Sequence, residues 1–450
     1  MGALYGAPLH AFGRVALSKP RVHMVSALPT ARRMIICMDY NAAGQSMGCQ
    51  LLFQRLKQLS PDSILGLMAK FRTDPSSSKV DLGVGVYRDL SGNTPVLASV
   101  GRAEQAVLAA QTTKSYVAAA GREEFNGAVE EMVLGPAHAA RRDRRARTTQ
   151  TPGGCGALRV GAELIRAAAP AATVHVSDPT WGNHTPLLGS SGLRLERYPY
   201  YDPAAHRLRF DAMLGQLERA AEGDVVLIHA CCHNPTGADL DPQQWQALAQ
   251  LLARRHLVPF LDLAYQGFAG GLEADAAGVR LVAAQVPEAL IAISFSKNLG
   301  LYRERTGALI AIGENETRAD AMLSHMLQIA RSIYSMPPDH GAAIAAHIFA
   351  NPGLKGEWLE ELAAMRTRIA DMRGLLARHL HEATGDPTFD FIRLQHGMFS
   401  LLGVSVEAVQ RLRDEHHIYM LSDSRMNLAG ITPHNVAYVA NAIALECRPT

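Results

Sequence analysis

A lysine stands at the end of an apolar stretch, in the run Ser294-Phe295-Ser296-Lys297-Asn298. The residues before it predict a buried strand, so the amine of Lys297 is expected to lose solvent. Desolvation lowers the pKa of an amine and frees its lone pair for attack on an aldehyde. The alternative is a lysine whose side chain reaches the surface. Only seven of the 44 basic residues are lysines. Genome composition explains most of that bias, but a buried lysine here is a candidate for chemistry that arginine cannot perform.

An aspartate occupies a similar place in Leu261-Asp262-Leu263-Ala264-Tyr265, near the end of another apolar run. A carboxylate is costly to bury without a partner. Asp262 could be hydrogen-bonded to a neighbouring loop, or it could pair with a cationic ring nitrogen of a cofactor.

Two loops complete the set of candidate motifs. Thr151–Leu158 contains Gly153, Gly154 and Gly156 and opens a helical run, so its free backbone N–H groups suit a phosphate. Cys232–Gly237, with Asn-Pro at its centre, follows an apolar strand that ends at His229. Either loop alone could be a plain turn. Together, a phosphate cradle, an Asn-Pro turn, a strand-end aspartate and a strand-end lysine meet the needs of a pyridoxal-phosphate site.

The elements that must position these residues alternate between strand and helix. The predicted strands are Thr173–Val176, Leu193–Tyr198, Val225–His229, Val258–Leu263, Ala289–Ser294 and Ala308–Ile312. Several are continuous apolar runs, as in strands covered on both faces. Asp241 followed by Pro242 predicts a helix start. The pattern indicates a mainly parallel α/β sheet, followed by a long helix over about 354–383 and a mixed α+β tail.

Composition excludes several classes of protein. The formal net charge is +2 and no apolar run is long enough to span a membrane, so neither a nucleic acid nor a membrane is expected as a partner. Six cysteines, two of them adjacent, form no disulfide framework or metal spacing. Residues 1–38 contain five basic residues and no acid, as in an organellar transit peptide, although a wrongly chosen start codon is the preferred explanation. We therefore predict that residues 1–50 are a disordered extension.

From about residue 62 to 445 the chain resembles the aspartate/aromatic aminotransferases, the class I, fold-type I enzymes that depend on pyridoxal phosphate. The matching stretches, in order, are Leu82–Tyr87, Arg147–Leu158, Pro179–His184, His233–Gly237, Asp262–Phe268, Ser294–Gly300, Tyr334–Gly341 and Arg425–Gly430. The resemblance implies a large domain over 95–355 with a seven-stranded, mainly parallel sheet. It also implies a smaller α+β domain made of 60–94 and 356–450.

The resemblance also implies roles at the cofactor. Lys297 is expected to bind pyridoxal phosphate as a Schiff base and to move the proton at the substrate α-carbon. Asp262 is expected to pair with the ring nitrogen, with His184 behind it. Tyr265 and Asn234 are expected at the ring's phenolic oxygen. Trp181 is expected to stack on the ring. The expected phosphate ligands are Gly154, Cys155, Ser294, Ser296 and Arg305, with Tyr116 from a second subunit.

Substrate contacts follow from the same resemblance. Arg425, helped by Asn234, is expected to bind the α-carboxylate, beside Phe399. Arg331 of the partner subunit is expected to bind the distal carboxylate of a dicarboxylic substrate. Gly85 is expected where the N-terminal segment closes over the site. Shared sites of this kind imply a homodimer.

The predicted function is a ping-pong transaminase in the cytoplasm, or in an organelle if 1–38 is a transit peptide. It would move the amino group of aromatic L-amino acids, aspartate and glutamate to 2-oxoglutarate. Cys155 and Met336 depart from the family's polar residues and favour this broad specificity. A narrow aspartate aminotransferase is the alternative. A pyridoxal-phosphate lyase and a non-catalytic regulator are less favoured, and the extension shows no helix-turn-helix pattern.

Overall fold

The computed structural model describes residues 39–40, 46–47, 52–59 and 63–447. The chain divides into two compact units, Met1–Ser60 and Pro61–Thr450. In the first unit β1 (Asp39–Tyr40) pairs antiparallel with β2 (Ser46–Met47). The rest of the predicted disordered extension, and the whole of the predicted transit peptide, lie outside the described residues.

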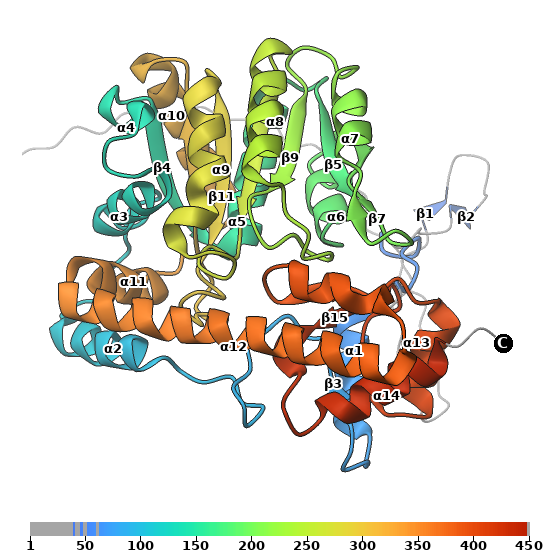
Figure 1. The fold of residues 1–450 in the computed structure, drawn as a ribbon. Coiled ribbons are helices and arrows are strands. Elements are labelled where there is room, and N and C mark those ends of the chain that lie inside the picture. The colour runs from blue at the N-terminus through green and yellow to red at the C-terminus, as the bar shows by residue number, and fades with distance from the viewer. Residues whose placement is uncertain (1–38, 41–45, 48–51, 60–62, 448–450) are drawn as a thin grey trace, which may run out of the picture. The chain divides into compact units, whose positions relative to one another are not determined.

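A seven-stranded sheet forms the centre of the second unit (Figure 1). Its order is β4 (Ala146–Pro152), β12 (Thr306–Ile312), β11 (Ala289–Ser294), β10 (Val258–Leu263), β9 (Val225–His229), β5 (Thr173–Asp178) and β6 (Arg194–Pro199). Only β12 runs antiparallel to its neighbours, β11 and β4. The predicted α/β fold with a seven-stranded, mainly parallel sheet is confirmed. The strand β4 was missed in the sequence.

Alternating side chains of the strands serve two separate apolar cores. Leu227 and Phe260 belong to the core that includes α5 (Gly153–Ala168) and α10 (Glu316–Ile333). Ile228 and Leu261 belong to the core that includes α3 (Glu123–Leu134), α8 (Pro242–Arg254) and α9 (Leu272–Gln285). The strands are therefore apolar without a break because both faces are covered.

The helix α8 begins as the sequence predicts. The Asp241 carboxylate accepts a hydrogen bond from Gln244 N at 2.8 Å, and the Gln244 side chain accepts one from Asp241 N at 3.0 Å. This reciprocal pair satisfies two backbone donors that a helix start otherwise leaves free.

The remaining elements of this unit lie beside the sheet or below it in the view of Figure 1. The helices are α1 (Ser63–Thr73), α2 (Ala98–Ala110), α4 (Ala139–Arg142), α6 (His184–Gly189), α7 (Phe210–Leu217), α11 (His340–Ala350), α12 (Pro352–Thr384), α13 (Val406–Asp414) and α14 (Val436–Glu446), with 3₁₀ turns η1 (Pro387–Leu394) and η2 (Leu428–Gly430). The short strands are β3 (Val80–Asp81), β7 (Tyr201–Asp202), β8 (Arg207–Leu208), β13 (Phe399–Leu401), β14 (Ile418–Tyr419) and β15 (Arg425–Asn427).

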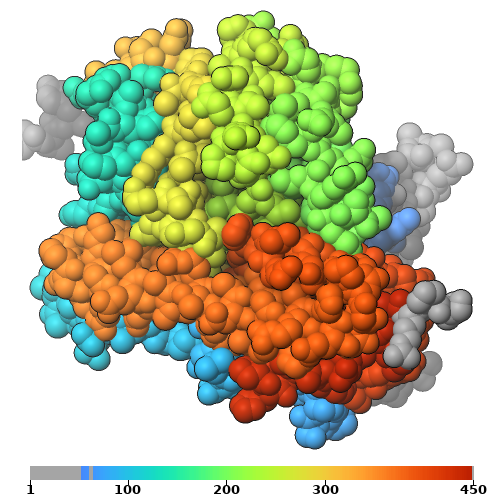
Figure 2. All heavy atoms as spheres, viewed as in Figure 1, coloured from blue at the N-terminus to red at the C-terminus, as the bar shows by residue number. Residues whose placement is uncertain are grey.

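The long helix α12 lies along the surface from α2 and α11 to α14 (Figures 1 and 2). It is 33 residues long and matches the helix predicted over 354–383. The N-terminal strand β3 pairs in parallel with β14, which places 80–81 among the C-terminal elements. The predicted division into domains of 95–355 and of 60–94 with 356–450 stays a prediction. Among the described residues, no helix is long and apolar enough to cross a membrane.

Candidate active site

A cavity of about 240 Å³ lies at the carboxyl-terminal edge of the sheet. The strands β9, β10 and β11 end there, and β12, which runs the other way, begins there. A larger hollow of about 980 Å³, lined by parts of α3, α9, α11 and α12, contains none of the predicted site residues. The smaller cavity is the candidate site because the chemically active side chains converge on it.

Lys297 follows β11 and faces the ring of Tyr265, with Nζ 5.2 Å from the ring centroid. Burial lowers the pKa of the Lys297 amine, although the carboxylate of Asp262 acts in the opposite direction. A lowered pKa increases the neutral fraction of the amine, which is the nucleophilic form. Burial also raises the pKa of the Tyr265 hydroxyl, so this phenol stays a hydrogen-bond donor.

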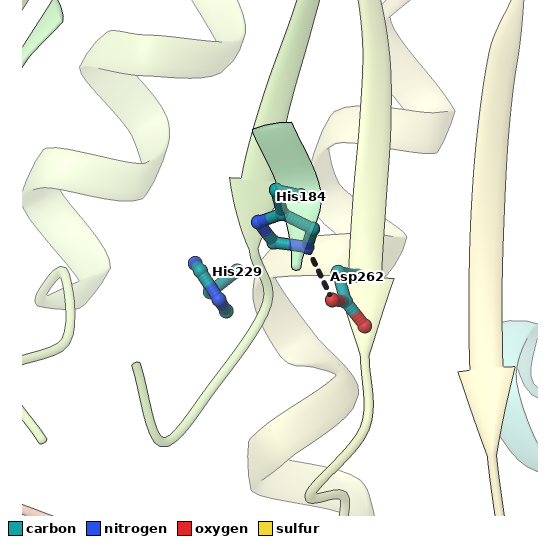
Figure 3. A group of neighbouring side chains, drawn as sticks. All are labelled: His184, His229 and Asp262. Carbon is teal, nitrogen blue, oxygen red and sulfur yellow. Dashed lines mark hydrogen bonds and ion pairs between the residues drawn. The ribbon is translucent and has the colours of Figure 1, made fainter. Parts of the chain in front are cut away.

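Asp262, on β10, is held by His184, whose Nε2 lies 3.0 Å from Asp262 Oδ2 (Figure 3). The other ring nitrogen, Nδ1, lies 2.8 Å from Thr180 Oγ1. Burial alone would raise the pKa of Asp262, but the hydrogen bond with His184 opposes this effect, and on balance the pKa is lowered. An ionised carboxylate only accepts hydrogen bonds, so His184 Nε2 carries the proton in this pair.

His229 lies beside this pair (Figure 3). Its side chain also lines the cavity. The rings of His184 and His229 are 5.0 Å apart. Burial, aided by the charge of His184, lowers the pKa of His229 to about 3. His229 is therefore neutral, and its Nε2 has no hydrogen-bond partner among the described residues.

A cup of polar groups forms where α5 begins. Gly153 has a left-handed φ of +67°, and a Cβ on it would lie 2.7 Å from Arg305 Nη2, so a side chain here would strain the backbone and clash with the guanidinium. Arg305 donates to Ser296 Oγ at 3.3 Å. Gly154 packs against Ser294. The helix N-terminus, two hydroxyls and a guanidinium are suitable groups to bind a phosphate.

Arg425, on β15, is almost fully buried and lines the cavity. Its Nη2 donates to Gly83 O at 2.9 Å and its Nη1 to Asn234 Oδ1 at 3.2 Å. Its guanidinium carbon lies 4.4 Å from the ring centroid of Phe399. Within the described part of the chain, Nε has no partner. A buried guanidinium with a free donor can bind a carboxylate.

Most of the predicted site residues line one cavity. They are Gly85, Gly154, Cys155, Trp181, Asn234, Asp262, Tyr265, Ser294, Ser296, Lys297, Arg305, Phe399 and Arg425. His184 lies behind Asp262, as expected. Trp181 makes an edge contact with His184, with ring centroids 5.3 Å apart.

Two predicted residues lie elsewhere in this chain. Tyr116 is 89% exposed and lines a groove beside α2 and α11. Arg331, at the end of α10, is exposed and donates to Ser335 Oγ. Neither lines the cavity of its own chain, and the family resemblance assigns both to the site of a second subunit.

Four lining residues were not predicted, namely Ile64, Leu158, His229 and Ala264. The sequence places His229 at a strand end beside the site, but no pattern in it indicates that the side chain lines the cavity. Ile64 belongs to α1, which precedes all the matching stretches and is part of none of them.

Comparisons with known proteins agree on one family. A family model described as aminotransferase class I and II matches residues 77–443. The chain is 45% identical to the aspartate aminotransferase of Escherichia coli K12 over 87% of this chain and 99% of that protein. It is 44% identical to the aromatic-amino-acid aminotransferase of Paracoccus denitrificans, over 86% and 98%. A crystal structure of the aromatic-amino-acid aminotransferase of Burkholderia pseudomallei, covalently bound to pyridoxal phosphate, superposes with a TM-score of 0.87 at 41% identity, covering 89% of this chain and all of that one.

Proposed function

Because the chain belongs to the class I and II aminotransferases and is a pyridoxal-phosphate-dependent enzyme, we propose that it moves amino groups from aspartate, glutamate and aromatic L-amino acids to 2-oxoglutarate. The observation that supports this most is one cavity that joins a buried amine, a buried carboxylate and a buried guanidinium. These are Lys297, Asp262 and Arg425.

The residues fit the cofactor. The cup at Gly154, with Cys155, Ser294, Ser296 and Arg305, would hold its phosphate. Lys297 would hold it covalently, and Asp262 would hold the ring nitrogen. Asn234 and Tyr265 would hold the ring hydroxyl, and Trp181 would cover the ring face. When bound, the cofactor supplies an electron sink for the bond broken at the substrate α-carbon.

The protein's own groups supply binding and proton movement. Arg425, steadied by Asn234 and Gly83 O, would bind the α-carboxylate through its free donor. Lys297 Nζ, neutral once released, would take the proton from the α-carbon and return it to the cofactor. Asp262 keeps its negative charge through His184 and so stabilises positive charge on the ring nitrogen.

The distal carboxylate of a dicarboxylic substrate needs a second cation, and we propose that Arg331 of the partner subunit provides it in a homodimer. Tyr116 of the partner subunit would complete the phosphate cup. The exposure of both side chains in this chain supports the proposal. Sites built from two subunits require the dimer for activity.

Mixing two inactive variants tests this dimer. Lys297→Arg and Arg331→Ala chains, unfolded together and refolded, should recover about a quarter of wild-type aspartate turnover, because half of randomly assembled dimers are hybrids with one intact site. The matched control refolds Lys297→Arg with Asp262→Asn. Those two changes lie in the same chain's cavity, so each hybrid then has two damaged sites and gains nothing. Equal activity in the two mixtures would contradict the shared site.

A kcat/KM panel of aspartate, phenylalanine and tyrosine with 2-oxoglutarate tests the substrate range. We expect the aromatic values to lie within about tenfold of aspartate, a difference of about 1.4 kcal/mol. The names of the relatives, which include both aspartate and aromatic enzymes, support this breadth. Values far lower for both aromatics would instead make the enzyme a narrow aspartate aminotransferase.

Glutamate alone tests the reaction type. Added to the holoenzyme, it should change the absorbance of the bound cofactor, and an unchanged spectrum would contradict transamination.

We also propose a cytoplasmic location. N-terminal sequencing of the native protein would decide whether 1–38 is removed.

A further inference from the structure

One thiol lies inside the cofactor cavity. Cys155 is in the first turn of α5, is half-buried and lines the cavity with Lys297 and Arg305. Its Sγ lies 3.9 Å from Asn183 Nδ2. The other described cysteines do not line this cavity. Cys231 and Cys232 are buried, and Cys447 is half-buried beyond α14.

The cavity around Cys155 contains buried polar atoms that lack hydrogen-bond partners in the part of the chain that the structure describes. Two almost fully buried side chains that line the same cavity, His229 and Arg425, each have a nitrogen without a partner in the described residues. Cys155 is half-buried rather than sealed off in this cavity, so a small reagent that enters the cavity can reach its thiol.

We propose that Cys155 is a thiol-modification site for small disulfides, open only while the cofactor is absent, and that the adduct stops the cofactor from binding. This inference rests on the proposed placement of the cofactor's phosphate beside α5. The enzyme would then lose cofactor loading under disulfide stress and regain it when a thiol reductant is supplied.

The step is thiol–disulfide exchange. Cys155 loses its proton to solvent, and its sulfur attacks one sulfur of the disulfide R–S–S–R. The S–S bond of the reagent breaks, a Cys155–S–S–R bond forms, and R–S⁻ leaves with the electron pair and takes up a proton. One thiol and one disulfide thus give one mixed disulfide and one thiol, and a reductant reverses the exchange.

The cavity is too small to hold both the Cys155 adduct and the cofactor. The cavity has about 240 Å³. Its wall near Cys155 is tight, because a Cβ on Gly154 would already lie 3.1 Å from Ser294 Cβ. A group attached to Cys155 Sγ would occupy part of the cavity that Ser294 and Arg305 also line, and so would compete with a phosphate for it.

The test uses the full-length apoenzyme and 2,2′-dithiodipyridine. The absorbance of released thiopyridone gives the rate, and peptide mass spectrometry gives the residue, including any reaction in the first 50 residues. Pyridoxal phosphate at 100 times its Kd should slow labelling of Cys155 by about 100-fold, because about 1% of sites stay free. Cys447 is the internal control. Burial raises the pKa of its thiol to about 11, and its slow labelling should not change with the cofactor.

Two variants complete the test. Cys155→Ser should lose the labelling that the cofactor blocks, whereas Cys447→Ser should keep it. Labelled wild-type apoenzyme should fail to take up pyridoxal phosphate, measured by the cofactor's absorbance after gel filtration, until dithiothreitol restores uptake. Labelling of Cys155 that the cofactor does not slow, or normal cofactor uptake by the adduct, would overturn the inference. If unlabelled apoenzyme takes up no cofactor at all, the proposed function fails instead.

Discussion

Replacing Lys297 with arginine should lower kcat by at least about 10⁴-fold, the upper range for losing a group that moves a proton in catalysis. A guanidinium stays protonated, so it can neither attack an aldehyde nor accept the α-proton. The fold should persist because most of the side-chain volume is kept. Steady-state kinetics with aspartate, together with circular dichroism and the melting temperature, measure both parts.

Lys355→Arg is the matched control. Lys355 lies on α12, is exposed, and does not line the candidate site. The same exchange there should leave kcat unchanged. Activity of Lys297→Arg above about 1% of wild type would mean that another lysine binds the cofactor, since a general acid–base group contributes at least about 10²-fold.

Replacing Asp262 with asparagine should lower kcat by about 10³-fold, the range for removing one preorganised electrostatic partner. Asparagine is nearly isosteric but cannot carry the negative charge that would hold a protonated ring nitrogen. Cofactor affinity should also fall, which equilibrium dialysis can measure without any turnover. The altered contact with His184 should cost about 1–3 kcal/mol of unfolding free energy.

Asp224 offers the matched control for that change. It is buried, and its Oδ2 lies 3.1 Å from His175 Nε2, so it forms the same kind of pair as Asp262 and His184. It precedes β9, at the opposite edge of the sheet from the cavity. Asp224→Asn should lose similar stability but keep kcat. A similar fall in kcat for both variants would mean that Asp262 acts through stability alone.

The central strands could be predicted well from the sequence. Each packs against an apolar core on both faces, so its residues form an unbroken apolar run. The bounds of β9, β10 and β11 match the predicted ranges. The strand β4 was missed because its sequence, Ala-Arg-Thr-Thr-Gln-Thr-Pro, is polar although three of its central residues are buried. Gln150 illustrates the reason, since its side chain donates to Pro338 O and accepts from Arg122 N. Hydrogen bonds to residues so distant in the chain produce no hydrophobic periodicity from which a strand could be predicted.

A site residue could be predicted where its type is rarely found at the end of a buried strand without a functional role. Lys297 and Asp262 met that condition, and the family resemblance supplied most of the rest. His229 did not meet it, because a histidine that ends an apolar strand is usually core. Ile64 was missed since its approach depends on how α1 packs, which no local pattern encodes. Tyr116 and Arg331 are exposed in this chain, and their roles stay proposals.

The reversed direction of β12 has a consequence for how the site can change. Because β11 and β12 form an antiparallel pair, the link between them turns back at the cavity. One short segment, 294–306, therefore carries Ser294, Ser296, Lys297 and Arg305. An insertion there would shift the amine against the guanidinium and separate the covalent anchor from the phosphate. Loops at the opposite edge of the sheet do not hold several site residues in one segment. Their lengths can therefore vary, whereas the length of 294–306 must stay constant.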